Sequence, residues 1–308
     1  KYSLLVVFVF GVMTGIAQNG NSAFAFTQIP ISVVSAALGG SQVATWRGDV
    51  NQVSDNPAFI DSSLHQSVSL NYLNYLTTIN QASIAYSRMF DSIGFGSMYL
   101  RYFDYGTFQG YDESGNDLGE FKVVDYEVGI SFGRKLNDHI NYGATLKNVF
   151  SSMYQSFAYG AALDLGGYYQ STNGNFTAGL TIDNLGLEII DYSGGERNFF
   201  PASINAAISK KFDKAPIMFG LQYSNIQTWD LAGVDGDVLA NPTIDPLTGE
   251  ESRPVVTLDN FARHLSASVA LIPSDNFNLM LGYNFRRRLE LATSERPGLV
   301  GFSFGANI

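Results

Sequence analysis

Apolar residues alternate with polar or small residues, at a period of two, through most of the chain between Lys122 and Leu271. From Val124 to Phe132, every even position is apolar, and the positions between carry acidic or small side chains. A period of two places successive side chains on opposite faces of a β-strand. The pattern therefore predicts a series of strands that each have one apolar face and one polar face. The same alternation continues in residues 140–147, 157–166 and 176–183.

The connections between these segments alternate in length. The short connections are turn-like: Asp91–Gly94, Gly133–His139, Gln170–Asn175, Asp213–Pro216 and Pro273–Asn276. Most of the others are longer: Gln109–Glu120, Leu185–Phe200, Asp230–Val256 and Arg288–Pro297, with Leu76–Gln81 and Ser151–Ser156 as exceptions. Short periplasmic turns that alternate with longer extracellular loops are typical of outer-membrane barrels. A soluble sandwich or solenoid has no reason to sort its loops in this way. We therefore expect an all-β, antiparallel transmembrane β-barrel, with about 12 strands in this chain.

Composition supports a wall that meets lipid. Charged residues make up 15% of the chain, whereas an ordinary soluble domain carries about 25%. The 31 Gly, 17 Tyr and 23 Phe suit a crowded barrel wall with aromatic girdles. The formal charge of −10 argues against a nucleic-acid partner, which would select basic patches. The chain has no Cys, which excludes disulfides, thiolate metal sites and a cysteine nucleophile.

The chain divides into three parts. Residues 1–17 read as a signal peptide, with a basic residue, an apolar run and a small-residue cleavage site after Ala17. Residues 18–66 lack the alternation and are rich in small residues and turn pairs, so we expect a compact plug-like segment in the barrel mouth, with a flexible periplasmic tail as the alternative. We expect residues 67–308 to form the barrel. The last strand breaks off at Ile308, so we expect the C-terminal strands of the barrel to be missing. The N-terminus would be periplasmic and the long loops extracellular, in the outer membrane of a Gram-negative bacterium.

Charged residues occur on the polar faces of the strands, which we assign to the lumen. They could line a pore, or they could pair with one another and fill the interior. Their mixed signs favour pairing. The predicted lumen-facing residues are Asp125, Glu127, Lys147, Asp164 and Asp183.

The residues offer no catalytic constellation. The three His, at positions 65, 139 and 264, have no partner at ligand spacing, and His264 with Ser266 lacks a third group. Asp235-Gly236-Asp237 does not match the spacing of a calcium loop and is better read as solvated. We therefore predict a protein that is not an enzyme and that holds no metal or cofactor.

The longest connection, Asp230–Val256, is the candidate for binding a partner. Its root carries Trp229, a residue type enriched in binding anchors. The predicted partner-binding residues are Trp229, Asp230, Asp235 and Asp237. A second candidate is the basic run Arg286–Arg288, which could bind a lipopolysaccharide phosphate or could pair with Glu290.

Several short blocks occur in an order and spacing that resemble a known family. They are Ala36–Gly40, Asn56–Ala58, Leu70–Tyr72, Ile84–Tyr86, Tyr105–Phe108, Phe200–Ser203, Lys210–Phe212, Trp229–Leu231, Arg286–Leu291 and Gly298–Gly305. The first two blocks resemble the N-terminal signature of the superfamily of fatty-acid-transporter-like barrels. The other blocks narrow the resemblance, across nearly the whole mature chain, to the PorQ family of type IX secretion system barrels, in the superfamily that also includes the PorV family.

The resemblance implies about fourteen strands in the full barrel, and a role as a non-enzymatic membrane anchor. It implies an attachment complex with a PorV-like barrel, a sortase-like protease and an extracellular PorZ-like protein, which couples secreted cargo to lipopolysaccharide. The alternative, which the wider superfamily implies, is a channel for uptake of hydrophobic small molecules.

Overall fold

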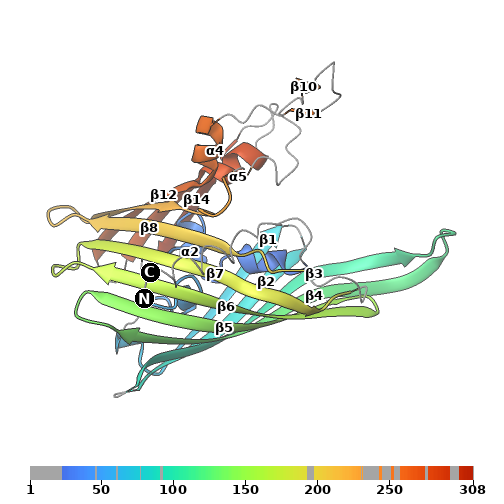
Figure 1. The fold of residues 1–308 in the computed structure, drawn as a ribbon, viewed down its shortest axis with the longest axis horizontal. Coiled ribbons are helices and arrows are strands. Elements are labelled where there is room, and N and C mark those ends of the chain that lie inside the picture. The colour runs from blue at the N-terminus through green and yellow to red at the C-terminus, as the bar shows by residue number, and fades with distance from the viewer. Residues whose placement is uncertain are drawn as a thin grey trace, which may run out of the picture.

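Twelve antiparallel strands form one sheet, whose order follows the chain from β1 to β9 and then β12, β13 and β14. This computed structural model describes residues 23–45, 47–59, 62–76, 78–90, 93–192, 198–229, 231, 243–244, 251–252, 257–274, 277–291 and 298–307. The sheet curves around the N-terminal residues (Figure 1). The predicted all-β antiparallel fold and its strand number are confirmed.

The strands have the following bounds. They are β1 (Ser67–Leu76), β2 (Ile79–Phe90), β3 (Gly94–Tyr111), β4 (Asp117–Lys135), β5 (Ile140–Met153), β6 (Ser156–Gln170), β7 (Phe176–Ile190), β8 (Ser203–Lys211), β9 (Ile217–Tyr223), β12 (Leu265–Ser274), β13 (Phe277–Asn284) and β14 (Phe302–Asn307). Two short strands, β10 (Thr243–Ile244) and β11 (Glu251–Ser252), pair only with each other. Two helices, α4 (Thr257–Arg263) and α5 (Phe285–Leu291), flank β12 and β13.

The short connections lie where the alternation predicts them, but two predicted loops are wrong. The segment 109–120 continues the ladder, and β3 and β4 turn only at Asp112–Asn116. Stacking of Phe108 on Phe121 across the two strands, with ring centroids 5.8 Å apart, extends this hairpin beyond the rest of the sheet (Figure 1). Strand β7 likewise continues to Ile190, inside the predicted loop 185–200.

The outer face of the sheet is apolar. Leu146 in β5 and Ile130 in β4 are half exposed, at 50% and 53%. The same face exposes many other aliphatic side chains at mid-strand: Leu70, Ile84, Leu100, Leu163, Leu165, Leu180, Ile208, Leu221, Leu279 and Leu281. In water such a surface would be costly, since apolar surface is normally removed from solvent.

Aromatic side chains bound this aliphatic face on both sides. The row nearer the short turns consists of Phe90, Phe132, Tyr142, Tyr169, Phe212, Phe219 and Phe277. The opposite row includes the stacked pair Phe150 and Tyr159, with ring centroids 4.8 Å apart. On β6, Tyr159 and Tyr169 are ten positions apart, or about 33 Å along the strand and about 25 Å along the barrel axis at a tilt of ~40°. That height matches the apolar band of a transmembrane barrel.

The described residues between positions 23 and 64, which we call the inner segment, lie against the concave face of the sheet (Figure 1). They fold into short pieces: η1 (Ala25–Gln28), α2 (Val33–Ala37), η2 (Val50–Ser54) and η3 (Ser62–Leu64). The Ser32 hydroxyl caps α2 by accepting from the Ser35 amide, and the Asp49 carboxylate caps η2 by accepting from the Asn51 amide. No helix among the described residues is long and apolar enough to cross a membrane.

Glycines in the wall let the inner segment approach the backbone of the strands. A Cβ on Gly166 of β6 would collide with Asn56 and Pro57, and one on Gly143 of β5 would collide with the Pro57 carbonyl. The next wall residue, Gly167, has open space, with its nearest atom 3.9 Å from such a Cβ. The Asn-Pro pair therefore sits in a cradle that the strands keep free of side chains.

A seam separates the first and last strands of the sheet. No hydrogen-bonded pairing joins β1 to β14 within the described ranges. Helix α2 contacts both strands there. A pocket of about 510 Å³ opens at this seam, and its lining is mainly apolar, with Val33, Leu73, Met280 and Phe304 among the lining residues.

Candidate functional site in the barrel lumen

Charged side chains cross the inner face of the wall from strand to strand. Arg101 of β3 lies opposite Glu127 of β4 in the ladder, and the two side chains form an ion pair, each only 1% exposed. The Tyr99 hydroxyl donates to the other Glu127 oxygen at 2.6 Å. Because the charges pair with each other, this part of the wall carries no net charge.

Arg101 also joins the wall to the inner segment. Its Nη1 donates to the carbonyls of Phe26, at 3.2 Å, and Ile29, at 2.8 Å. Its guanidinium carbon lies 4.7 Å from the centre of the Phe26 ring, in a cation–π contact. One buried side chain therefore links β3, β4 and η1.

A second ion pair lies on the neighbouring strands. Lys147 of β5 pairs with Asp164 of β6 at 2.6 Å, and its Nζ also donates to the Asn184 side-chain oxygen at 2.9 Å. The backbone amide of Asn184 in turn donates to the Asp164 carboxylate at 2.7 Å. Asn184 has φ of 59°, in the left-handed region that Asn tolerates better than most residues. This backbone conformation directs the backbone N–H of Asn184 at the Asp164 carboxylate.

The remaining acidic residues on this face accept from neutral donors. Asp125 accepts from the Tyr105 hydroxyl at 2.6 Å and from the Ser151 hydroxyl. Asp183 accepts from Thr181 and from Asn205, both at 2.7 Å. The other Asp183 oxygen is buried and has no hydrogen-bond partner among the described residues.

The structure thus places all the predicted lumen-facing residues on the inner face of the sheet and joins them to partners. Sequence reasoning missed Arg101, the cation that pairs with Glu127. The alternation did indicate that Arg101 faces inward, because its neighbours in the strand are the outward-facing Leu100 and the half-buried Tyr102. The signal was obscured because the inward positions of β3 also carry the large aromatics Tyr99 and Phe103, so that neither face reads as polar.

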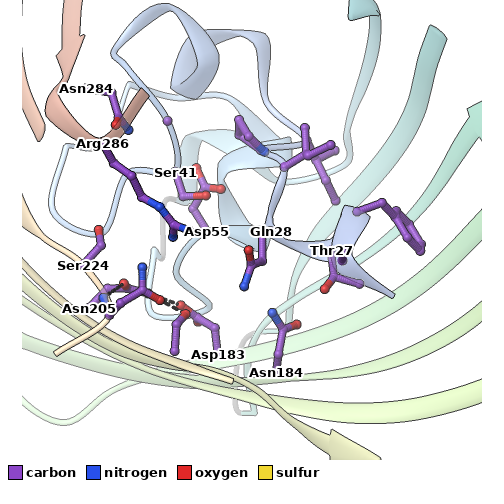
Figure 2. A pocket seen from close by; sticks show the side chains of 18 of the residues that line it. Thr27, Gln28, Ser41, Asp55, Asp183, Asn184, Asn205, Ser224, Asn284 and Arg286 are labelled. Carbon is purple, nitrogen blue, oxygen red and sulfur yellow. Dashed lines mark hydrogen bonds between the residues drawn. The ribbon is translucent and has the colours of Figure 1, made fainter. Parts of the chain in front are cut away.

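A cavity of about 600 Å³ remains between the inner segment and the wall. Figure 2 shows side chains that come from the inner segment and from the wall, with the Arg286 side chain directed toward Asp55 and Ser41. Its polar lining includes Thr27, Gln28, Ser41, Asp55, Asp183, Asn184, Asn205, Gln222, Ser224, Asn284 and Arg286. The lumen therefore carries many polar side chains among apolar ones, whereas the outer face is mainly apolar.

Asp55, in the inner segment, has a perturbed acidity. Burial raises its pKa to about 7, although hydrogen bonds from the Ser35 hydroxyl and the Gln42 amide oppose the shift. Near neutral pH this carboxyl therefore exchanges between its protonated and ionised forms.

Most of the predicted partner-binding residues lie outside the part of the chain that the structure describes. Asp230, Asp235 and Asp237 lie outside the described residues. Trp229 is 49% exposed, and its carbonyl lies 3.3 Å from Nε2 of His264. In the basic run, Arg286 forms an ion pair with Glu290, as one of the two alternatives foresaw.

The histidines are occupied in structural contacts. His65 accepts from the Met89 amide at 3.2 Å, His139 lies 3.0 Å from the Gln170 carbonyl, and His264 stacks on Tyr223, with ring centroids 4.7 Å apart. Within the described part of the chain, no group of three or more His, Asp or Glu could hold a metal ion.

No protein-family model and no curated protein matches this sequence. Among solved structures, the CymD monoaromatic hydrocarbon channel is similar, with a TM-score of 0.48 and 12% identity over 83% of this chain and 84% of that chain. The Pseudomonas putida toluene transporter TodX has a TM-score of 0.47 and 14% identity over 87% of this chain and 84% of that chain. Likenesses at this level do not bear on what this chain binds.

Proposed function

We propose that this chain is an outer-membrane β-barrel that acts as a non-enzymatic anchor for an assembly at the cell surface. The observation that carries this proposal is the inner segment, which is hydrogen-bonded to the wall on many sides and occupies the lumen. The bonded strands are β1, β2, β3, β6, β7, β9 and β13. A barrel whose lumen is largely occupied by a segment bonded to its wall, and whose outer face is an apolar belt, suits an anchor better than an open pore.

The apolar belt supports insertion in the membrane. Its height of about 25 Å between aromatic rows, and its aliphatic centre, are the features that hold a barrel at a fixed depth in a bilayer. Only outer membranes hold such barrels in Gram-negative bacteria. We place the short turns in the periplasm and the long connections outside, as the alternation of loop lengths predicts.

The resemblance to the PorQ family supplies the finer proposal. It makes the assembly the type IX attachment complex, with a PorV-like barrel, a sortase-like protease, an extracellular PorZ-like protein and lipopolysaccharide as the partners. The Asp230–Val256 connection, with Trp229 at its root, is the part that we expect to hold the extracellular partner.

A second candidate function is uptake of hydrophobic small molecules. The observation that favours it is the mainly apolar pocket of about 510 Å³ at the seam between β1 and β14. That volume is in the range of small-molecule sites, which run from about 300 to 1,000 Å³.

Two measurements separate these functions. Affinity purification of the tagged chain from native outer membranes should recover the sortase-like protease and the extracellular partner, whereas recovery of the barrel alone would contradict the anchor. Uptake of toluene or palmitate into proteoliposomes should not exceed that of protein-free vesicles. Uptake that Leu73→Arg abolishes, while the outward-facing control Tyr72→Arg leaves it intact, would establish the second candidate.

A further inference from the structure

The lumen cavity has a lining that an anchor does not need. The cavity measures about 600 Å³, within the range of sites that bind small molecules. A lumen that served only as packing would be filled by side chains, because protein interiors leave few voids larger than a water molecule.

The charges around this cavity compensate one another. Arg101 pairs with Glu127, Lys147 with Asp164, Arg263 with Asp259, and Arg286 with Glu290. The other charged groups of the lining are Asp55, Asp183 and Arg287. When Asp55 is protonated, the charges of these pairs and groups sum to zero, so the cavity offers no excess charge to an ion and a neutral ligand fits it best.

The uncharged lining offers both donors and acceptors. The Gln28 side chain lies among the cavity-lining residues in Figure 2, is exposed, and makes no hydrogen bond to any described residue. Asn184, Asn205 and Ser224 line the same cavity (Figure 2). The Asn205 side-chain amide already donates to Asp183, but its oxygen accepts only from the Asn225 amide among the described residues and keeps one lone pair for a ligand. A free amide has two donors and one acceptor oxygen, so the complementary ligand must also both donate and accept.

One end of the cavity is aromatic. Tyr75 and Tyr105 are partly exposed in its lining, and both rings pack on the buried Phe103, with ring centroids 6.0 and 4.9 Å from it. Such rings supply a flat apolar surface with a polar edge. Amides with an adjacent aromatic face complement a molecule that has hydroxyls at its rim and C–H groups on its flat side.

We infer that the lumen cavity is a binding site for a small neutral saccharide, which hydrogen-bonds to Gln28 and Asn205 and stacks on Tyr75 and Tyr105. Sugar hydroxyls both donate and accept, as this lining requires. The site is independent of the proposed anchoring role.

The test is isothermal calorimetry on the full chain in lauryldimethylamine oxide micelles, since glycosidic detergents would compete for the site. The probes are maltose and N-acetylglucosamine. At least one should bind with a stoichiometry near one, and Gln28→Leu should weaken it at least tenfold. Gln28 is exposed and unbonded, so this variant should fold normally. Gln170→Leu, the same change at an exposed glutamine of the β6 end away from the cavity, should bind as the wild type does.

Three results would overturn the inference. The first is heat of binding from neither saccharide. The second is binding that Gln28→Leu and Gln170→Leu leave equally intact. The third is displacement of the bound saccharide by equimolar inorganic phosphate, which would make the cavity an anion site. A second variant, Asn205→Leu, should also lose binding, and heat-modifiability on a gel should verify that it is folded.

Discussion

Removing the Arg101 side chain should destabilise the barrel far more than the loss of an ion pair at the protein surface would. Arg101→Met leaves Glu127 buried at 1% exposure without its cation, and it removes the donors to the Phe26 and Ile29 carbonyls. Breaking a buried pair by deleting one partner costs about 3–5 kcal/mol, since the remaining charge is left uncompensated. Methionine keeps most of the side-chain volume, so the cavity contribution stays small.

The second mutation should restore most of this loss. In Arg101→Met/Glu127→Gln neither buried charge remains, and the glutamine oxygen can still accept from the Tyr99 hydroxyl, which the wild-type carboxylate accepts at 2.6 Å. We expect the double variant to recover at least about 2 kcal/mol relative to Arg101→Met, within the usual range of coupling between contacting residues.

The free energy of unfolding should be measured by urea titration in micelles, with the gel shift between folded and unfolded barrel as the signal. Arg286→Met is the matched control, because its pair with Glu290 is more exposed, at 23% and 24%, and such pairs contribute about 0.2–1 kcal/mol. If Arg101→Met cost less than about 1 kcal/mol, or if the double variant were no more stable, the coupling of wall and inner segment through this pair would be refuted.

Three further variants test other parts of the structure. Gly166→Ala should displace the inner segment, because the added Cβ would collide with Asn56. The control Gly167→Ala should change stability by less than about 0.5 kcal/mol. Limited proteolysis should therefore cut the inner segment in Gly166→Ala and not in Gly167→Ala. Leu146→Arg, at mid-strand on the outer face, should cost about 2–4 kcal/mol in lipid vesicles, against about 0–1 for Leu136→Arg in a short turn, and equal costs would count against the membrane belt. Between pH 4 and 7 Asp55 should contribute a fall in stability of up to about 4 kcal/mol, because the folded carboxyl, with its pKa raised to about 7, retains a proton that the unfolded chain releases. Asp55→Asn should remove this contribution and make the fall with pH shallower, and a slope equal to that of the wild type would contradict it.

The strands and their faces were readable from the sequence because their pattern is local. The alternation from Val124 to Phe132 directly reports which side chains face out. Where residues of both faces are alike, as at 109–120 in the β3–β4 hairpin, the period vanishes and a strand resembles a loop. The stacked rings of Phe108 and Phe121, which hold that hairpin together, are a cross-strand contact that one-dimensional spacing does not reveal.

The lumen was readable only in part. Mixed signs among Glu127, Lys147 and Asp164 favoured paired charges over a pore, but the partner Arg101 was overlooked. The cavity could not be foreseen, because it depends on where the inner segment comes to rest. Gln28 in particular has no sequence signal that distinguishes it from an ordinary surface glutamine.

The hydrogen bonds of the inner segment have a consequence for the order of folding. Gly39 accepts from Asn284, 245 positions away, and Arg47 donates to Asn278, 231 positions away. The residues exported first must therefore wait for the last strands before their contacts exist. Chains dominated by such distant contacts fold slowly and expose apolar surface while they do so. For this barrel the speed of assembly, more than the final stability, should limit yield, so its biogenesis should depend strongly on periplasmic chaperones that shield the waiting strands.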